Sequence, residues 1–191
     1  EFGGFLKNIN NSKKLNGLEI NRNCIKFLKE NIKKINIIKN LENNKTKFDV
    51  ITMFHVLEHL PNPIDSLLEL IKKVEAGGHI IIEVPHANDF LLSNLACEEF
   101  KQFTLWSQHL ILHTRESLRK TLEYVGLRDI QIEGVQRYPL SNHLNWLAKG
   151  KAGGHKSPIS AIDSEALSDA YKNSLARIDA TDTLVAIAKV T

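Results

Sequence analysis

Apolar and polar positions alternate along the chain with two different periods. Runs of apolar residues that are short enough for buried strands occupy four segments: 15–20, 36–39, 48–54 and 78–84. Between them, apolar residues recur every three or four positions, which predicts helices carrying Ile25 to Ile32 and Ile64 to Val74, the second stopped by Gly77-Gly78. Strands that alternate with helices of this length predict an α/β fold with a doubly wound, mostly parallel sheet.

The second half of the chain is less regular. After Pro85 the pattern lapses until Thr114, which is predicted to cap a helix that ends at Gly126, and 127–135 then alternates like a strand. We expect 137–162 to be irregular. Asp163 or Ser164 is predicted to cap a last helix before a closing strand over 183–190. We therefore expect one domain over 1–191, in which 137–162 is an insertion that covers the substrate.

Composition and charge are those of an ordinary globular protein of 191 residues with a net charge of +3. The apolar runs are too short to span a membrane, and no leader-like segment opens the chain, so we expect a cytoplasmic protein. The two cysteines, Cys24 and Cys97, do not suggest a disulfide framework. The lysines before Asp49 follow a helical pattern with few aromatics, which favours a solvated helix face over a nucleic-acid surface.

Candidate binding residues stand where the predicted strands end, because parallel sheets bind ligands beyond the carboxyl ends of their strands. Glu19 ends its strand about one helix after Gly3 and Gly4, where a carboxylate can accept the ribose hydroxyls of an adenosine cofactor. The glycines look like the tail of a glycine-rich loop. An ordinary surface glutamate at the start of a helix is the alternative for Glu19.

The segment His55-Val-Leu-Glu58-His59 also fits the inverted zinc-protease signature. That chemistry needs both histidines on one face of a long helix. Here the segment leaves a buried strand directly and Pro61 follows at once, so a zinc hydrolase through these three residues is a remote alternative. We predict no metal site.

The order of these strand exits resembles the class I S-adenosylmethionine-dependent methyltransferases, in their bacterial small-molecule and glycan type. The similar blocks are LNGLEIN, KFDVITMFHVLEHLPNP, GGHIIIEVPHAN and HLILHTRESLRKTLEYVGL, which together cover about Gly3 to Val135. The resemblance implies a Rossmann-like fold with an antiparallel last strand. Its departure is the opening loop, reduced to Glu1 to Gly4, with the first strand of the family's sheet absent from the chain.

The resemblance also implies S-adenosylmethionine as cofactor and S-adenosylhomocysteine as product. The residues that it places at the cofactor are Gly3, Gly4, Glu19, Ile20, Asn40, Leu41, Phe54, His55 and His59. Methyl transfer from a sulfonium needs the acceptor held in line, and a base of near-neutral pKa where the acceptor must lose a proton. The candidate bases are His109, which we favour, and then His86 and His113.

The acceptor side combines an aromatic residue with cations and amides. Its candidate residues are Asn88, Trp106, Arg137, His143, Lys151 and His155. Such a set suits a sugar or nucleotide-sugar hydroxyl in glycan biosynthesis, although similar bacterial enzymes also act on quinone precursors. The segment from Lys151 to His155 could wrap an anion with backbone N–H groups.

A second reading belongs to a different class of function. The shortened glycine loop would suit a non-catalytic relative that keeps the fold as a binding or assembly module. In either case we expect a small-molecule partner, no nucleic acid and no membrane span, and we leave a homodimer open.

Overall fold

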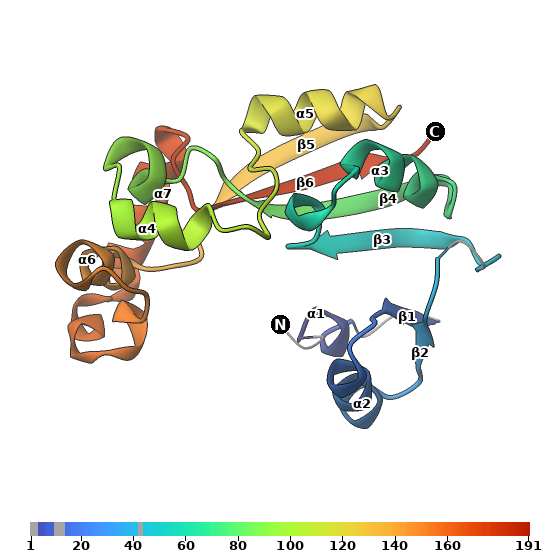
Figure 1. The fold of residues 1–191 in the computed structure, drawn as a ribbon, viewed down its shortest axis with the longest axis horizontal. Coiled ribbons are helices and arrows are strands. Elements are labelled where there is room, and N and C mark those ends of the chain that lie inside the picture. Colours follow the sequence, from blue (N-terminus) through green and yellow to red (C-terminus); the bar gives the residue numbers. More distant parts are fainter. Residues whose placement is uncertain (1–3, 10–13, 42–43) are drawn as a thin grey trace. The chain divides into compact units, whose positions relative to one another are not determined.

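The computed structural model describes residues 4–9, 14–41 and 44–191, and the chain divides into two compact units, Glu1–Thr46 and Lys47–Thr191 (Figure 1). We describe each unit by itself. The single domain expected over 1–191 stays a prediction. Gly3, a predicted cofactor residue, lies outside the described residues.

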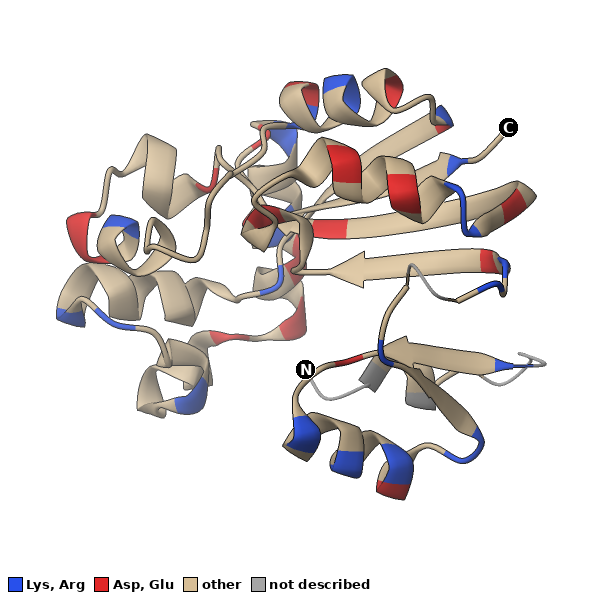
Figure 2. Cartoon of the chain, turned by 45° about the vertical axis from the view of Figure 1, so that its right-hand side comes forward, with Lys and Arg blue, Asp and Glu red and all other residues tan. Residues whose placement is uncertain are grey.

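The smaller unit is a strand–helix–strand motif behind a short helix. Its elements are α1 (Gly4–Lys7), β1 (Leu15–Leu18), α2 (Arg22–Asn31) and β2 (Ile35–Ile38). The two strands pair in parallel, with Leu15 opposite Ile35. The side chain of Asn21 caps α2 by accepting two backbone N–H groups. Lysine and arginine lie along α2 (Figure 2), and Lys26 is exposed, which confirms the predicted solvated face.

The larger unit contains a four-stranded mixed sheet and several helices. Its strands are β3 (Phe48–Phe54), β4 (Val74–Pro85), β5 (Arg128–Val135) and β6 (Thr183–Lys189). Its α-helices are α3 (Pro63–Ile71), α4 (Glu98–Thr104), α5 (Arg115–Tyr124), α6 (Leu140–Lys149) and α7 (Glu165–Arg177). The strand order is β3-β4-β6-β5. β3 and β4 are parallel, whereas β6 runs antiparallel to both β4 and β5, as predicted for the last strand.

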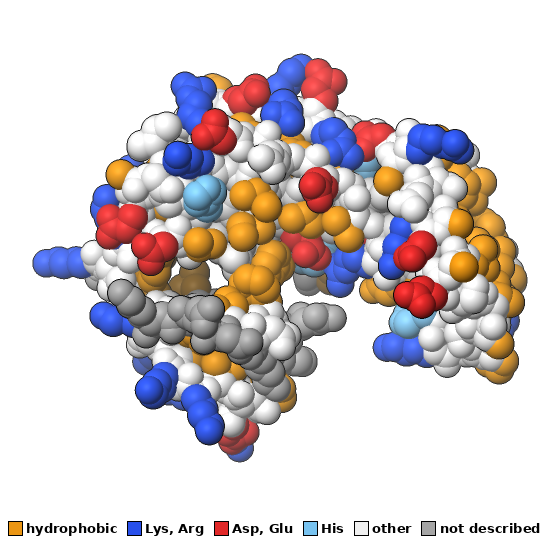
Figure 3. All heavy atoms as spheres, turned by 180° about the vertical axis from the view of Figure 1, so that it is seen from behind, with side chains coloured by type: hydrophobic (Ala, Val, Ile, Leu, Met, Phe, Trp, Pro, Cys, Tyr) orange, Lys and Arg blue, Asp and Glu red, His pale blue; other side chains and the backbone are white. Residues whose placement is uncertain are grey.

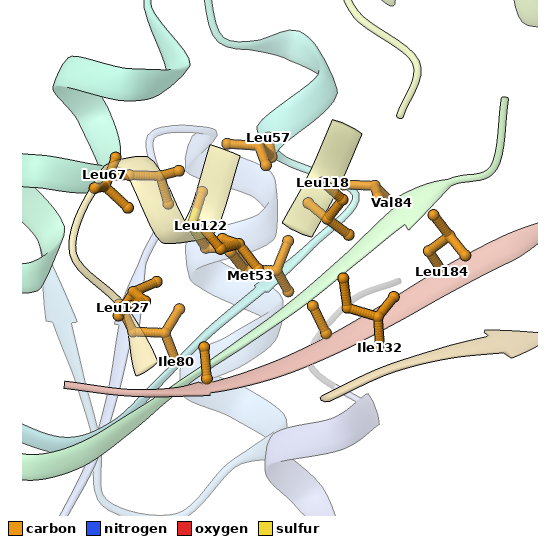
Figure 4. Packing of buried hydrophobic residues seen from close by; sticks show 14 of the residues in the cluster. Met53, Leu57, Leu67, Ile80, Val84, Leu118, Leu122, Leu127, Ile132 and Leu184 are labelled. Atoms are coloured by element: carbon orange, nitrogen blue, oxygen red, sulfur yellow. The ribbon is translucent and has the colours of Figure 1, made fainter. Parts of the chain in front are cut away.

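Helices α3 and α5 pack on this sheet through fully buried leucines (Figure 4). Leu67 of α3 and Leu118 and Leu122 of α5 contact the cluster that contains Ile80 and Leu184 of the sheet. Burial of a leucine side chain of this kind contributes about 1.5–3 kcal/mol. The N-terminus of α5 carries the predicted Thr114 cap as a reciprocal capping box with the third residue of the helix.

The boundary between α3 and β4 differs from the sequence expectation. The helix was expected to reach Val74, but it ends at Ile71, and Val74 already pairs with Phe48 of β3. Gly77 then adopts φ +79°, and the pairing resumes at Val50 opposite His79. The two glycines therefore form a bulge inside a long strand and do not end a helix, because only a left-handed residue lets the strand skip forward in register.

The irregular segment expected over 137–162 was also wrong in part. It contains α6, followed by two 3-10 turns over Gly154–Lys156 and Pro158–Ile162. The buried face of α6 is mostly polar, since it carries Ser141, Asn142, His143 and Asn145 beside Trp146. A helix that buries polar side chains has no apolar periodicity to detect. Two further helical segments, η2 (a π-helical turn, Phe90–Asn94) and α4, occupy the stretch before Thr114 in which no regular pattern was found.

In the described part of the chain, no helix is long and apolar enough to cross a membrane. Cys24 and Cys97 are both free thiols, and they lie in different units.

Candidate active site

In the smaller unit, Glu19 directly follows β1 and lines an open cleft with Arg22, Ile25, Lys29 and Lys39. One carboxylate oxygen, Oε1, accepts the backbone N–H groups of Ile20 and Asn21 at 2.8 Å each. These bonds fix the carboxylate at the strand exit.

The other cofactor candidates of this unit are placed as follows. Gly4 opens α1, Ile20 beside Glu19 is 85% exposed, and Asn40 and Leu41 follow β2, the first exposed and the second half-buried. Glu19, Ile20, Asn40 and Leu41 therefore stand just beyond the carboxyl ends of two parallel strands, as the resemblance implies.

In the larger unit, polar side chains gather where β3 and β4 end. Phe54 is the last residue of β3 and is half-buried. His55 follows it with φ +53°, a left-handed conformation that is uncommon for a residue with a side chain and clusters at functional sites. Its Nε2 lies 2.9 Å from Oε1 of Glu83 and its Nδ1 lies 3.3 Å from Oε1 of Glu58. Arg137 completes the group, with Nη1 3.2 Å from Glu83 and in contact with His55.

His109 stands beside this group in the segment between α4 and α5. Its Nδ1 lies 2.7 Å from the carbonyl oxygen of Thr104, so the neutral ring carries its proton on Nδ1 and leaves Nε2 as an acceptor. The ring is half-buried, with the ring of His59 4.9 Å away and that of Trp106 5.8 Å away. This orientation is the one that a general base requires.

His86 and His113, the other two candidate bases, are buried to within a few per cent. Burial lowers the pKa of both rings; for His113 the nearby Glu58 carboxylate opposes that shift, and for His86 Asp179 and the Thr181 carbonyl do. The Nδ1 atom of His86 lies 3.0 Å from the Thr181 carbonyl oxygen, and that of His113 lies 3.3 Å from Ser117 Oγ. Their burial favours the half-exposed His109 as the residue that could touch an acceptor.

The candidate acceptor residues fall into two groups. Trp106 and Arg137 lie beside the histidines, and Asn88 lines a cleft at the N-terminus of α5. His143 is enclosed instead, since its Nδ1 meets the Tyr171 hydroxyl at 2.6 Å and burial lowers its pKa to about 4. His155 lies with its Nδ1 3.2 Å from the Asn142 side chain.

The segment from Lys151 to His155 folds onto α6. The Lys151 carbonyl accepts a bond from Asn145, and the Gly153 N–H donates to Asn142. At least one of the N–H groups predicted to wrap an anion is thus engaged by the protein itself, while the Lys151 side chain is exposed.

The structure adds two residues to the predicted set, Glu58 and Glu83. Glu58 was considered only as part of the zinc signature, and Glu83 stands in the otherwise apolar strand sequence IIIEVP, where a single carboxylate is the signal that could have found it. Residues 57–59 form one 3-10 turn rather than a long helix, which removes the geometry that an inverted zinc protease requires. Glu58, His59 and His109 nevertheless place ligand atoms within 4.8 Å of one another, compact enough for a cation.

A family model described as "Methyltransferase domain" matches residues 3–132, which is more than half of the chain. The chain belongs to this methyltransferase family. Membership confirms the predicted resemblance to methyltransferases. Glu19 lies at the exit of β1, and Phe54 and His55 lie at the exit of β3; that these residues bind a cofactor stays a prediction.

Curated relatives of this methyltransferase include the ubiquinone biosynthesis O-methyltransferase of Aliivibrio fischeri (strain MJ11), 26% identical over 107 residues, which are 53% of this chain and 45% of that protein. The mitochondrial ubiquinone biosynthesis O-methyltransferase of Candida albicans is 47% identical over 36 residues, which are 19% of this chain and 11% of that protein. The matches thus span less than half of these relatives.

Solved structures share the fold. An S-adenosylmethionine-dependent methyltransferase from Archaeoglobus fulgidus has a TM-score of 0.54 at 23% identity, covering 91% of this chain and 75% of that one. Phosphoethanolamine N-methyltransferase 2 of Haemonchus contortus, in complex with S-adenosyl-L-methionine, has a TM-score of 0.51 at 15% identity, covering 93% and 43%. These likenesses confirm the Rossmann-like fold with its antiparallel last strand.

Proposed function

We propose that this methyltransferase domain transfers the methyl group of S-adenosylmethionine to a hydroxyl oxygen of a small aromatic molecule. The observation that carries the proposal is the orientation of His109, whose Nδ1 is held by the Thr104 carbonyl while Nε2 is left to accept a proton. The relatives named above support transfer to oxygen, since their names state it.

The surroundings of His109 favour an aromatic acceptor. Large apolar side chains remain exposed at the end of α4 and on the segment that follows it, among them Phe103, Leu105, Trp106 and Leu110. Hydrophobic side chains also gather along the end of the larger unit that carries α4, α6 and α7 (Figure 3). Exposed apolar surface of this kind marks ligand or partner sites more often than plain solvent-facing surface.

Bound S-adenosylmethionine supplies a methyl group on a sulfonium, which leaves the protein the tasks of positioning and proton removal. In this proposal Phe54 and His55 line the methionine side of the cofactor, and Trp106 stacks on the acceptor ring. The role of Glu19 at the ribose stays a prediction from the resemblance. His109 Nε2 takes the hydroxyl proton. A general base of this type contributes about 10²–10⁴ to the rate.

The sugar or nucleotide-sugar acceptor predicted from the sequence is a second candidate that Arg137 and Asn88 would serve through polar contacts. The relatives give it no support, and it stays a prediction. The two candidate acceptors differ in chemistry, since Trp106 would contact an aromatic ring in one and a sugar ring in the other. One assay that offers both kinds of acceptor can therefore separate them.

The test uses the full-length protein with methyl-labelled S-adenosylmethionine, a panel of catechols and a panel of sugars and nucleotide-sugars. We expect S-adenosylhomocysteine and a methyl ether from a catechol. Methylation of a sugar alone would replace the aromatic acceptor. Calorimetric binding of S-adenosylhomocysteine without turnover of any acceptor would overturn the enzymatic proposal in favour of a non-catalytic binding module.

A further inference from the structure

Glu58 ties the turn after β3 to the segment that carries His109. Its backbone carbonyl accepts the N–H of Leu110 at 2.8 Å and that of Ile111 at 3.4 Å. The turn itself, Leu57–His59, begins three residues after the end of β3. The backbone of Glu58 therefore fixes where the His109 segment crosses the carboxyl edge of the sheet.

The side chain of Glu58 is fully buried, and neither of its oxygens has a hydrogen-bond partner among the described residues. A buried carboxylate without compensation is strongly unfavourable. Two imidazole rings that can carry a positive charge lie close to it. His55 Nδ1 lies 3.3 Å from Oε1, and His59 Nε2 lies 3.7 Å from the same atom. A proton on His55 Nδ1 or on His59 Nε2 would therefore compensate this carboxylate.

Backbone carbonyl groups orient the rings of His59 and His109, which both lie near Glu58. His59 Nδ1 lies 2.7 Å from the Gln108 carbonyl oxygen, and His109 Nδ1 lies 2.7 Å from that of Thr104. Each ring, when neutral, therefore has its proton on Nδ1 and an unprotonated Nε2. Since ligand atoms of both rings and of Glu58 lie within 4.8 Å of one another, a proton added to this pair would be held beside a carboxylate.

We propose that Glu58 is a positioning residue of the acceptor site, whose buried carboxylate lies beside the His59–His109 pair and stabilises the imidazolium formed when His109 accepts the acceptor's proton. This inference rests on the function proposed above. In that step the hydroxyl proton moves to His109 Nε2, and an oxygen electron pair forms the new bond to the methyl carbon. The carbon–sulfur bond breaks with its pair on sulfur, and the proton later leaves His109 for solvent. Glu58 itself touches neither substrate nor cofactor.

The kinetic test compares Glu58→Gln, which keeps the shape and removes the charge, with Glu69→Gln on the exposed face of α3 as a matched control. We expect Glu58→Gln to lower kcat about 10–100-fold, a part of what general base catalysis supplies, with the KM for S-adenosylmethionine within about twofold of wild type. On acidic acceptors such as nitrocatechols the loss should shrink, because their hydroxyl is already ionised. An equal loss on all acceptors, or none, would overturn the proposal.

A second measurement decides the matter even where no acceptor is turned over. Long-range ¹⁵N–¹H NMR of the histidine rings should show the signals of His59 and His109 displaced in Glu58→Gln, while those of the exposed His79 stay in place. Unchanged His59 and His109 signals would refute the positioning role. Stoichiometric zinc or another divalent ion in the purified wild type, lost in Glu58→Gln, would overturn it in favour of a metal ligand. Absence of turnover by the wild type, in contrast, counts against the proposed function only.

Discussion

Replacement of Gly154 by alanine tests how the segment over 137–162 is held. A Cβ at this position would lie 2.0 Å from the Ser141 carbonyl oxygen, 2.6 Å from the Ser141 carbonyl carbon and 2.8 Å from the Asn142 Cα. All three atoms are backbone in the first turn of α6, so no side-chain rotation can relieve the clash. The turn and the helix must move apart.

The expected loss of stability can be estimated from the hydrogen bonds that this movement would break. The Gly153 N–H donates to Asn142 Oδ1 at 3.0 Å, and Asp163 accepts the Ser141 N–H at 3.2 Å. Each bond contributes about 0.5–1.5 kcal/mol net, and overpacking a tight contact adds about 1–3 kcal/mol, so we expect about 2–6 kcal/mol of lost stability. At about 2–4 °C per kcal/mol for a chain of this size, the melting temperature should fall by at least about 4 °C.

The assay is thermal unfolding followed by circular dichroism, with Gly153→Ala as the matched control. Gly153 has open space around it but φ +108°, so alanine there meets only backbone strain, about 1 kcal/mol. If Gly154→Ala melted within about 1 °C of wild type, or above Gly153→Ala, the packing of this turn against α6 would be refuted.

Three further predictions concern the site and its pH dependence. Glu19→Ala should weaken S-adenosylhomocysteine binding by about 1–3 kcal/mol in calorimetry, and unchanged affinity would remove Glu19 from the cofactor site. His109→Ala should cut turnover about 10²–10⁴-fold while the affinity for S-adenosylhomocysteine is kept, and near-normal turnover would mean that another group, or none, takes the proton. Burial raises the pKa of Asp89 to about 7, against two backbone N–H groups that lower it, so the folded state binds a proton that the unfolded state has released. The stability of wild type relative to Asp89→Asn should therefore fall as pH rises from about 4 to about 7 in urea unfolding, and a pH-independent difference would contradict the shift.

Elements that bury an apolar face could be predicted closely from the sequence. The bounds of β3 were predicted as observed, and the N-cap of α5 at Thr114 and that of α7 at Ser164 are in place. In each case the local signal and the tertiary packing agree, because the side chains that define the period are those that enter the core. The same agreement explains why β6 was found from its run of small and branched residues.

Helix α6 escaped prediction because its packing is polar. His143 and Gln136 form a buried contact at 3.3 Å, and Tyr171 of α7 completes it from a distant part of the sequence. A local sequence pattern cannot predict that His143 will contact Tyr171, which lies 28 residues away in the sequence. The glycine pair at 77–78 was wrongly predicted to end a helix. A β-bulge and the end of a helix both favour glycine, so the residue type alone does not distinguish them.

The candidate site was predictable in place but not in arrangement. The ends of the predicted strands correctly indicated the carboxyl edge of the sheet as the place of the site. His55, His59, His109 and Arg137 lie there. The preference for His109 over His86 and His113 came from the family resemblance alone, and the structure adds the physical difference, since His86 and His113 are buried and His109 is not. Glu58 was in view throughout, yet its importance depends on a carboxylate being enclosed by rings from two segments, which only the folded chain shows.

The position of β6 has a consequence for how the larger unit is made. β6 is central in the sheet, between β4 and β5, although it is synthesised after both. While a ribosome is still adding residues before Thr183, β4 and β5 each present an unpaired edge, which is a template for aggregation.

Pairing of Ile80 with Ala188 also joins residues far apart in sequence, and such non-local contacts make folding slow. The nascent chain thus exposes these two strand edges until β6 emerges, and this interval is when it is most prone to aggregate.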